Sequence, residues 1–497
     1  MHLYLISLLV IVFVTLLTWT PLATTSVGIL DIIPNILKSA RQIVFGDSWQ
    51  GIGIFAFAFF LYAILQSQAI QSLFADKKKW LQKKGLRTVA LITIVSSFLA
   101  SGLSWYDEFI YFYPLVVPLL LAMGFDAFSA LLCLFGGASA GQMSKFSSEA
   151  MGQNFNECVN SHEALEGKAV KFTGSDGMGF RVVAWLILTA IVVMFNLWYC
   201  NKIFQKSKTE TKQLTTRLTE KKATPIFNNA RKIILILAGF FLLASMAAQL
   251  KPIAKMQGKS QGQGVSPKIT SSYKSGVEYT GKDYQVLGEA GKEEKIKLAQ
   301  VNEGKEEKFW TTFGEWGDLQ LYSWFIIGGI IICLLSKQSI TNTLVVSLQK
   351  SIPLILSYIL MLTPILIIKD SGMSENIPKL LPVGVTQNAR YWLLFGALLI
   401  PFIINLFLPL TRGILVYIAV PILYAVSKNS LMYGTIIIFL GASIAMAFSP
   451  ANGILQTSLQ ENKITYKEYL KKTWVLGLFL LLAALLFVGF CAWSLAK

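Results

Sequence analysis

Histidine is almost absent from this 497-residue chain, which contains only His2 and His162. Catalytic triads and many zinc sites depend on histidine, so the sequence offers almost no material for either. The five cysteines show no paired spacing and lie mostly within or beside apolar runs, which indicates neither a zinc site nor a disulfide framework. The glycine-rich stretch 174–179 lacks the Lys-Ser/Thr of a phosphate-binding loop. We therefore expect no metal site, no cofactor and no enzymatic activity.

Charged residues are also scarce, at 14% of the chain, whereas hydrophobic residues make up 54%. About 20 apolar helical residues cross the roughly 30 Å of hydrocarbon in a bilayer, and many runs in this chain approach that length. The first run, residues 3–19, has no basic segment before it and no small-residue cleavage site before Pro21, so we expect a retained helix. The sequence predicts an all-α polytopic membrane protein.

Apolar runs predict the positions of the membrane helices. We expect about 11–13 transmembrane helices, the lower numbers applying if some runs form re-entrant hairpins. The thirteen candidate spans are 2–20, 51–70, 88–104, 109–124, 127–143, 180–200, 232–250, 319–336, 352–369, 391–409, 413–427, 431–449 and 474–495.

The positive charge is concentrated in two segments. Residues 75–87 hold six Lys/Arg against one acid and residues 202–232 hold nine against two, so they supply +12 of the formal +17. Both segments adjoin apolar spans, where basic residues mark the cytoplasmic side. This distribution favours a topology signal facing anionic lipid over nucleic-acid binding. It predicts a plasma-membrane protein with a cytoplasmic N-terminus.

Two segments outside the spans are distinctive. Residues 31–45 alternate apolar and basic residues as an amphipathic interfacial helix does, although an ordinary loop is the alternative. Residues 251–318 contain eleven lysines and ten acids and are too polar for a sizeable core, so we expect an extracytoplasmic accessory insert. We predict membrane halves at 1–250 and 319–497, with hairpins near 101–124 and 405–427.

A short pattern occurs once in each half. Residues 116–119 read Val-Val-Pro-Leu, and Gly-Ala-Ser follows at 137–139. Residues 419–422 read Ala-Val-Pro-Ile, and Gly-Ala-Ser follows at 441–443. The expected topology directs the two copies oppositely, which predicts inverted-repeat halves. Small residues also favour helix packing, so the pattern by itself does not identify a binding site.

Asp107 and Glu108 lie between two apolar runs. In an open loop they are interfacial carboxylates. At the tip of a re-entrant hairpin they lie deep, where adjacent carboxylates bind a cation, a proton or a basic group of a solute. The sequence leaves both interpretations open.

Neutral and basic candidates lie near the ends of the glycine-containing spans. A broken helix there would offer backbone groups and a helix dipole to an ion or a carboxylate, whereas a serine in an intact helix bonds its own backbone. Arg412 is either a counter-ion of the solute or a topology marker. These candidates are Ser139, Ser144, Ser443, Ser449, Asn452 and Arg412.

Residues 101–205 resemble the YfcC-like branch of the C4-dicarboxylate anaerobic carrier family, which includes arginine/ornithine-type antiporters and belongs to the ion-transporter superfamily. Further similarity occurs at 370–372 and 449–467, whereas residues 358–364 and 409–414 depart from the family pattern. The residues that carry the resemblance are Asp107-Glu108, Phe112-Tyr113-Pro114-Leu115, Pro118-Leu119, Gly124-Phe125-Asp126, Gly136-Gly137-Ala138 and Gly177-Met178-Gly179-Phe180-Arg181.

The resemblance implies a secondary active transporter, a symporter or antiporter, of a small carboxylate or amino acid. Its expected partners are that solute, the lipid bilayer and a coupling cation, with a homo-oligomer possible. The alternative is a non-transporting membrane receptor or scaffold that uses residues 251–318 to bind a partner.

Overall fold

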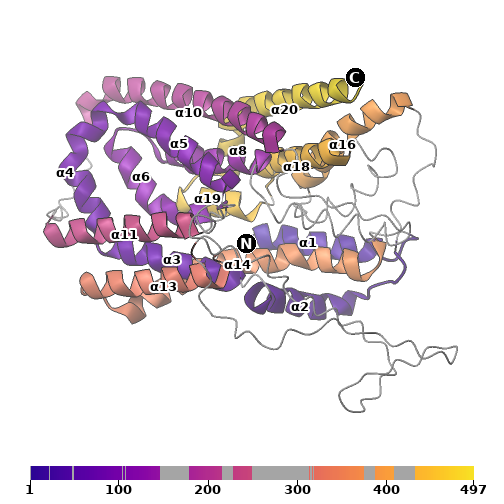
Figure 1. Cartoon of the computed structure of the whole chain (residues 1–497), viewed down its shortest axis with the longest axis horizontal. Helices are drawn as coiled ribbons and strands as arrows, with labels where there is room; N and C mark the ends of the chain where they lie inside the picture. Colours follow the sequence, from indigo (N-terminus) through magenta and orange to yellow (C-terminus); the bar gives the residue numbers. More distant parts are fainter. Residues whose placement is uncertain are drawn as a thin grey trace, which may run out of the picture. The chain divides into compact units, whose positions relative to one another are not determined.

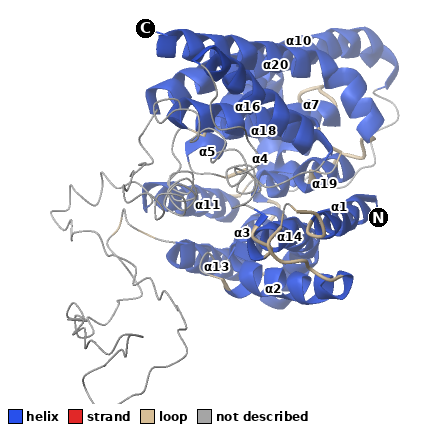
Figure 2. Ribbon diagram, turned by 90° about the vertical axis from the view of Figure 1, so that its right-hand side faces the viewer, coloured by secondary structure: helices blue, strands red, loops and turns tan. Residues whose placement is uncertain are grey.

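The computed structural model is helical throughout the part of the chain that it describes. No strand occurs among those residues, which confirms the all-α polytopic prediction (Figure 2). The described residues are 2–21, 23–46, 50–102, 105–106, 108–145, 178–214, 228–248, 313, 316, 318–373, 387–407, 431–450 and 452–496.

The chain forms two compact units. One unit contains residues 1–242 and 322–497, and the other contains residues 243–321. The membrane segments before and after the polar insert therefore share one unit. Most of the 251–318 insert lies outside the described residues, as does most of the predicted hairpin near 405–427. The division into halves remains a prediction.

The helices before the polar insert include several short elements (Figure 1). They are α1 (His2–Leu17), η1 (Ile29–Asp31), α2 (Ile32–Phe45), α3 (Gln50–Gln66), α4 (Ala69–Lys83), α5 (Gly85–Gly102), η2 (Glu108–Phe112), α6 (Tyr113–Ala122), α7 (Ala127–Leu131), the π-helix η3 (Leu132–Gly136), α8 (Gly137–Ser144), α10 (Met178–Leu214) and α11 (Asn229–Ala248). The later helices are α13 (Asp318–Leu335), α14 (Ile340–Asp370), α16 (Gln387–Phe407), α18 (Leu431–Phe448), α19 (Gly453–Glu461) and α20 (Tyr466–Ala496).

Within the described residues, five helical segments are long and apolar enough to cross a membrane. Shorter apolar segments of 10–17 residues occur as well, so the number of spans remains a prediction. The five long segments are Gly85–Gly102, Met178–Gln205, Ile340–Ile368, Ile436–Glu461 and Tyr466–Trp493. The shorter segments are Ser7–Leu17, Gly51–Gln66, Glu108–Ala122, Leu319–Leu335 and Leu394–Leu406.

Some expected boundaries differ from the observed ones. The basic segment 75–87 is not a loop, because α4 runs to Lys83 and α5 begins at Gly85. Helix α14 begins twelve residues before the predicted span at 352. Its first turns bury Thr343, Ser347 and Ser351, each of which donates a hydrogen bond to the carbonyl four residues earlier. Apolar runs alone did not reveal this polar but fully bonded start of the helix.

Residues 32–45 of the predicted amphipathic segment form α2, and Asp31 ends η1 before it. Ile33 and Leu37 are exposed, whereas Ser39 is buried and accepts a hydrogen bond of 3.0 Å from Thr363 of α14. The helical, amphipathic character is confirmed, and placement in the membrane interface remains a prediction.

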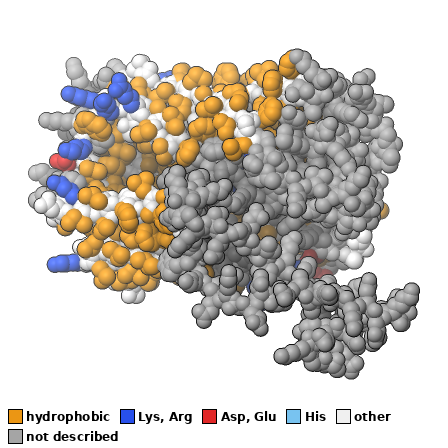
Figure 3. Space-filling model, viewed as in Figure 1, with side chains coloured by type: hydrophobic (Ala, Val, Ile, Leu, Met, Phe, Trp, Pro, Cys, Tyr) orange, Lys and Arg blue, Asp and Glu red, His pale blue; other side chains and the backbone are white. Residues whose placement is uncertain are grey.

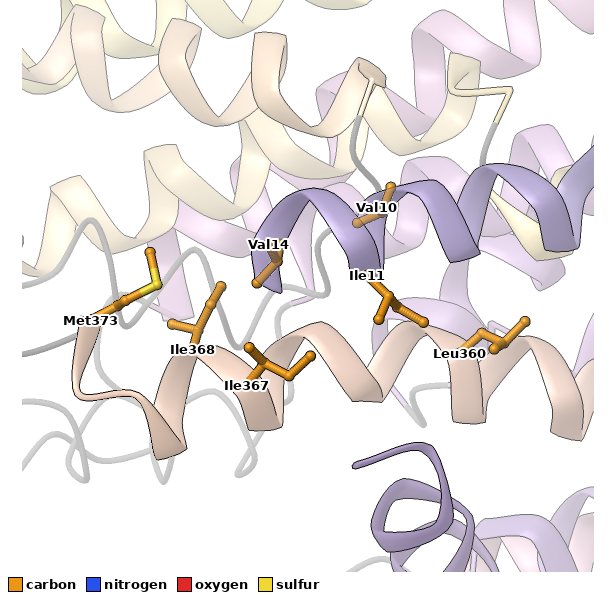
Figure 4. Packing of buried hydrophobic residues seen from close by; sticks show 7 residues of the cluster. All are labelled: Val10, Ile11, Val14, Leu360, Ile367, Ile368 and Met373. Carbon is orange, nitrogen blue, oxygen red and sulfur yellow. The ribbon is translucent and has the colours of Figure 1, made fainter. Parts of the chain in front are cut away.

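Helix α1 packs on α14 through a small aliphatic cluster (Figure 4). Beside it, Gly372 has φ of +68°, and a Cβ there would lie 2.2 Å from Thr24 Oγ1. Thr24 donates a hydrogen bond to the Ser371 carbonyl, which requires this close approach. The cluster comprises Val10, Ile11, Val14, Leu360, Ile367, Ile368 and Met373.

Two groups of three helices contain the Gly-Ala-Ser segments of the predicted repeat, whereas residues 116–119 lie in α6 and residues 419–422 lie outside the described part of the chain. We call α5, α8 and α10 the first triplet, and α16, α18 and α20 the second triplet. Within each triplet all three helices contact one another, and the triplets meet through α8 with α18 and α10 with α20. Figure 1 and Figure 2 both show α10 beside α20.

The first two helices of each triplet pack in the same register. A Cβ on Gly141 would lie 2.0 Å from the carbonyl oxygen of Ser97, and one on Gly441 would lie 2.2 Å from that of Leu398. Small residues at such contacts let two backbones approach closely. The partners are 44 positions apart in the first pair and 43 in the second. Gly441 thus packs on α16 as Gly141 does on α5. Gly137, which the Gly-Ala-Ser pattern aligns with Gly441, also packs on α5, because its Cβ would lie 2.6 Å from the Thr93 carbonyl oxygen.

The triplets also run in opposite directions. Phe180, at the start of α10, contacts Phe490 near the end of α20, with ring centroids 6.2 Å apart. At the other end of the pair, Lys472 Nζ lies 5.7 Å from the centre of the Tyr199 ring. Helices α10 and α20 are therefore antiparallel although they occupy equivalent places in their triplets. This is the arrangement that an inverted repeat predicts.

Candidate functional site

The helical structure is interrupted between α18, which ends at Phe448, and α19, which begins at Gly453. Asn452 is fully buried and caps α19, because its Oδ1 accepts a hydrogen bond of 3.0 Å from the Ile454 amide. Its Nδ2 donates to the Met446 carbonyl at 2.7 Å, so the same side chain also satisfies the last turn of α18. Ser449, also fully buried, donates to the Leu406 carbonyl at 3.1 Å. This interruption between the two helices therefore lies in the protein interior, with its polar side chains hydrogen-bonded.

Helix α8 ends in a comparable way in the first triplet. Lys145 adopts a left-handed conformation with φ of +34° and stops the helix. Ser144 donates to the Gly141 carbonyl at 3.0 Å, and its Oγ lies 3.3 Å from the Oγ of Ser101 at the end of α5. Arg181, only 1% exposed, donates through Nη1 to the Lys145 carbonyl at 3.1 Å. A buried cation therefore lies at the negative end of this helix dipole.

The two triplets touch where α8 crosses α18. Ser443 Oγ lies 3.4 Å from the carbonyl oxygen of Gln142, to which it donates. Ser139, one turn earlier on α8, is 4% exposed, and its buried hydroxyl has no hydrogen-bond partner among the described residues. The two Gly-Ala-Ser serines therefore both lie in the region of this crossing.

The segment before η2 lies inside the protein. Trp105 and Tyr106 are buried, at 8% and 3% exposure, and Phe109 is buried after them. Tyr106 Oη accepts a hydrogen bond of 3.3 Å from Asn452 Nδ2, and its ring lies 6.1 Å from that of Phe135. Glu108 begins η2 and is partly buried. The described residues of this segment are therefore buried or partly buried in the protein, and a position of the acidic pair at membrane depth remains a prediction.

Two contacts connect the regions that hold the predicted residues. Ser443 bonds Gln142 on α8, the helix of Ser139 and Ser144, and Asn452 bonds Tyr106, two residues before Glu108. We call α8, residues 443–450 and 452, and residues 105, 106 and 108 the helix-end site. Asp107 and Arg412 lie outside the described residues, so their roles remain predictions. The predicted residues at the helix-end site are Glu108, Ser139, Ser144, Ser443, Ser449 and Asn452.

Sequence reasoning did not select three buried polar residues near these helix ends. Arg181 had a usable signal, an arginine in the first turn of an apolar span, which is costly unless the position is specialised. Asn405 is fully buried, and its amide has no hydrogen-bond partner in the described part of the chain. Tyr106 resembled an interfacial aromatic residue, and only the fold shows its bond to Asn452, 346 residues away.

A π-helix distorts the helix that leads to Ser139. It spans Leu132–Gly136, and the Leu132 carbonyl accepts a hydrogen bond of 3.0 Å from Asn196 Nδ2 on α10. A π-turn disrupts the regular bonding ladder of a helix and frequently occurs at functional sites. Nothing in the apolar pattern predicted it.

The helix-end site combines complementary polar groups. It offers the guanidinium of Arg181, the amide of Asn452, several hydroxyls and the carboxyl group of Glu108. Hydroxyl and guanidinium donors at broken helix ends are suited to a small polar or anionic molecule. No group of three potential metal ligands occurs among the described residues.

The family model for the C4-dicarboxylate anaerobic carriers matches residues 69–492, most of the chain. The chain belongs to the C4-dicarboxylate anaerobic carrier family. The resemblance noted in the sequence is therefore confirmed at the family level. Together with the long apolar helices, membership identifies a multi-pass membrane protein. The finer placement in the YfcC-like branch remains a prediction.

Individual relatives add little about function. An uncharacterised protein from Haemophilus influenzae is 30% identical over 139 residues, which cover 26% of this chain and 25% of the relative. The Alcanivorax borkumensis YdaH transporter aligns over 99% of both chains with 12% identity and a TM-score of 0.47. Neisseria gonorrhoeae MtrF, described as an antimetabolite efflux pump, aligns over 99% of this chain and 94% of its own, with 12% identity and a TM-score of 0.44. These scores are too low to assign a function.

Proposed function

We propose that this family member is a secondary active transporter that moves a small carboxylate or amino acid across the plasma membrane. The observation that carries the proposal is the contact between two oppositely directed triplets where α8 crosses α18, with Ser443 donating to the Gln142 carbonyl close to the points where both helices end. Inverted repeats with discontinuous helices characterise several transporter folds, whose solute sites lie between the repeats.

The charge at the helix-end site favours a solute that carries a carboxylate. Arg181 supplies a permanent buried cation, and guanidinium groups bind carboxylates through paired donors. The hydroxyls of Ser139 and Ser443 would contact the polar groups of the solute, and Asn452 would hold α18, α19 and Tyr106 in place around it. The family description, which refers to C4-dicarboxylates, agrees with this choice.

The acidic pair would have a different role. Asp107 and Glu108 would bind a coupling cation, a proton or the basic group of an amino acid, because adjacent carboxylates attract positive charge. Transport would then draw on an ion gradient or on exchange. Alternating access would move one triplet against the other around the site, with the N-terminus in the cytoplasm.

A solute panel in liposomes tests this proposal. The full-length protein would be reconstituted with an internal solute, and exchange of radiolabelled dicarboxylates, arginine, ornithine and other amino acids would be measured with and without sodium and proton gradients. We expect at least one carboxylate-bearing solute to exchange above empty liposomes. Absence of exchange by correctly folded protein for every member of the panel would contradict the proposal.

Two further measurements test the role of the acidic pair and the role of the polar insert. Asp107→Asn and Glu108→Gln remove the negative charges. We therefore expect transport either to lose its dependence on a cation or to fail for basic solutes. Normal transport by both variants would exclude the proposed role of the acidic pair. Deletion of residues 251–312 should leave exchange intact if the insert is accessory.

A further inference from the structure

An open groove lies between α5 and α10, away from the helix-end site. It has a volume of about 440 Å³, and none of its lining residues is acidic. It lies near the start of α5, where residues 197–201 of α10 run past in the antiparallel direction. The lining residues are Leu86, Arg87, Ala90, Leu197, Trp198 and Asn201.

The polar end of the groove carries available positive charge and a hydrogen-bond donor. Arg87 is exposed and forms no ion pair with a carboxylate in the described part of the chain. Lys202 Nζ lies 5.8 Å from the centre of the Trp198 ring, which holds a second cation beside the groove. Asn201 accepts a hydrogen bond from Gln205 with its amide oxygen, so its Nδ2 can donate to a ligand. This combination is complementary to a phosphate group.

The other end of the groove opens onto apolar surface. The antiparallel register, set by the Ser97–Thr189 and Thr93–Asn196 hydrogen bonds, places Ile94 level with Met194. Ile94 is 42% exposed and Met194 is 63% exposed. Figure 3 shows the wider pattern, with Lys and Arg gathered at the left-hand edge of a broad hydrophobic surface. A ligand that fits both ends needs an anionic head and hydrocarbon chains.

We propose that this groove binds an anionic phospholipid. Arg87, Lys202 and Asn201 contact its phosphate, Trp198 lies at the level of the glycerol backbone, and the acyl chains run past Ile94 and Met194. Basic pockets between membrane helices bind anionic headgroups, and tryptophan is enriched at the membrane–water boundary. The lipid would bridge α5 and α10 from outside the first triplet.

Native mass spectrometry of the detergent-purified full-length protein tests the proposal. The protein is titrated with phosphatidylglycerol and with phosphatidylcholine of the same acyl chains, and bound lipid is counted at each concentration. We expect phosphatidylglycerol to bind more tightly. The double variant Arg87→Gln/Lys202→Gln should weaken that binding about tenfold or more, because each basic residue near an anionic lipid adds favourable electrostatic attraction.

Matched variants isolate the groove from general surface charge. Lys467→Gln/Lys471→Gln removes two exposed charges from α20 and should leave phosphatidylglycerol binding unchanged. Ala90→Trp keeps every charge but fills the groove, so it should also weaken binding, whereas Arg87→Lys should retain it. A folded Ala90→Trp protein that binds normally would contradict the groove as the site.

Three other outcomes overturn the proposal. Equal binding of the two lipids excludes recognition of the anionic headgroup. An equal loss in the groove and control double variants indicates nonspecific attraction. Displacement of phosphatidylglycerol by an equal concentration of glycerol phosphate, which lacks acyl chains, identifies a soluble-phosphate site instead.

Discussion

In the first triplet a cation reaches the end of α8, whereas in the second triplet a phenol reaches the end of α18. Arg181, near the start of α10, donates to the Lys145 carbonyl. Tyr466, at the start of α20, donates to the Phe448 carbonyl at 2.5 Å. In both triplets the third helix therefore satisfies a carbonyl that the end of the second helix leaves unbonded. The two contacts differ in charge, because the donor is a guanidinium group in the first triplet and a neutral hydroxyl group in the second.

The contacts between helices are also more polar in the first triplet than in the second. In the first triplet, α5 and α10 share side-chain hydrogen bonds, including Ser97 with Thr189 at 2.7 Å and Asn196 with Thr93 at 3.0 Å. In the second triplet, α18 is almost entirely apolar and buried from Ile436 onward, and Tyr469 of α20 donates to its backbone. The comparison teaches that glycine packing sets the shared geometry, while polar residues make one half chemically distinct.

The largest expected effect tests the shared geometry. Gly141→Ala and Gly441→Ala would each place a methyl group about 2 Å from a backbone oxygen that cannot rotate away. We expect both to lower the free energy of unfolding by similar amounts, about 3 kcal/mol or more, as severe overpacking does. Thermal unfolding of the purified protein measures this. Gly489→Ala is the control, because nothing lies within 4 Å of the added Cβ. Strongly unequal losses at the two sites would contradict their equivalence.

The next effect tests the charge difference. Arg181→Gln removes a buried cation whose Nη1 bonds the Lys145 carbonyl, so we expect loss of more than tenfold in the exchange of carboxylate solutes, equivalent to about 1.4 kcal/mol. Arg181→Lys keeps the charge and should restore part of it. Initial exchange rates in liposomes, normalised to folded protein, provide the measurement. Full activity of Arg181→Gln would remove this residue from the proposed site.

A third prediction compares two residues of the helix-end site. Asn452→Ala removes three hydrogen bonds that join α18, α19 and Tyr106, so we expect destabilisation of about 2 kcal/mol together with loss of transport. Ser139→Ala removes a hydroxyl without a described partner and should leave thermal stability unchanged. Reduced transport by Ser139→Ala at normal stability would therefore identify a solute contact, whereas normal transport would exclude one.

We expect the smallest effect from Tyr466, whose uncharged hydroxyl group bonds the end of α18 in the second triplet. Tyr466→Phe removes one hydrogen bond to the Phe448 carbonyl and no charge, so we expect about 1 kcal/mol of destabilisation and little change in solute selectivity. Melting temperature and solute competition provide the two readouts. A change in carboxylate selectivity as large as that of Arg181→Gln would erase the proposed distinction between the triplets.

Several site residues were predictable because the sequence makes them unusual. Glu108 is an acid between apolar runs, and Ser139 and Ser443 belong to a repeated Gly-Ala-Ser pattern. Asn405 and Tyr106 were not selected, because a single polar residue in an apolar run and an aromatic residue at its end are both common. The early start of α14 was also missed, since its buried serines and threonine satisfy their hydroxyls within the helix.

The sequence by itself determined the helical membrane character, the family and the positions of the paired Gly-Ala-Ser segments. Each depends on local composition, because apolar length fixes which segments form membrane helices and small residues permit close packing. Only the tertiary structure decided that Gly141 and Gly441 occupy equivalent contacts, that α10 and α20 run antiparallel, and that Asn452 reaches Tyr106. Those relations join residues up to several hundred positions apart, and packing in three dimensions alone sets which of them meet.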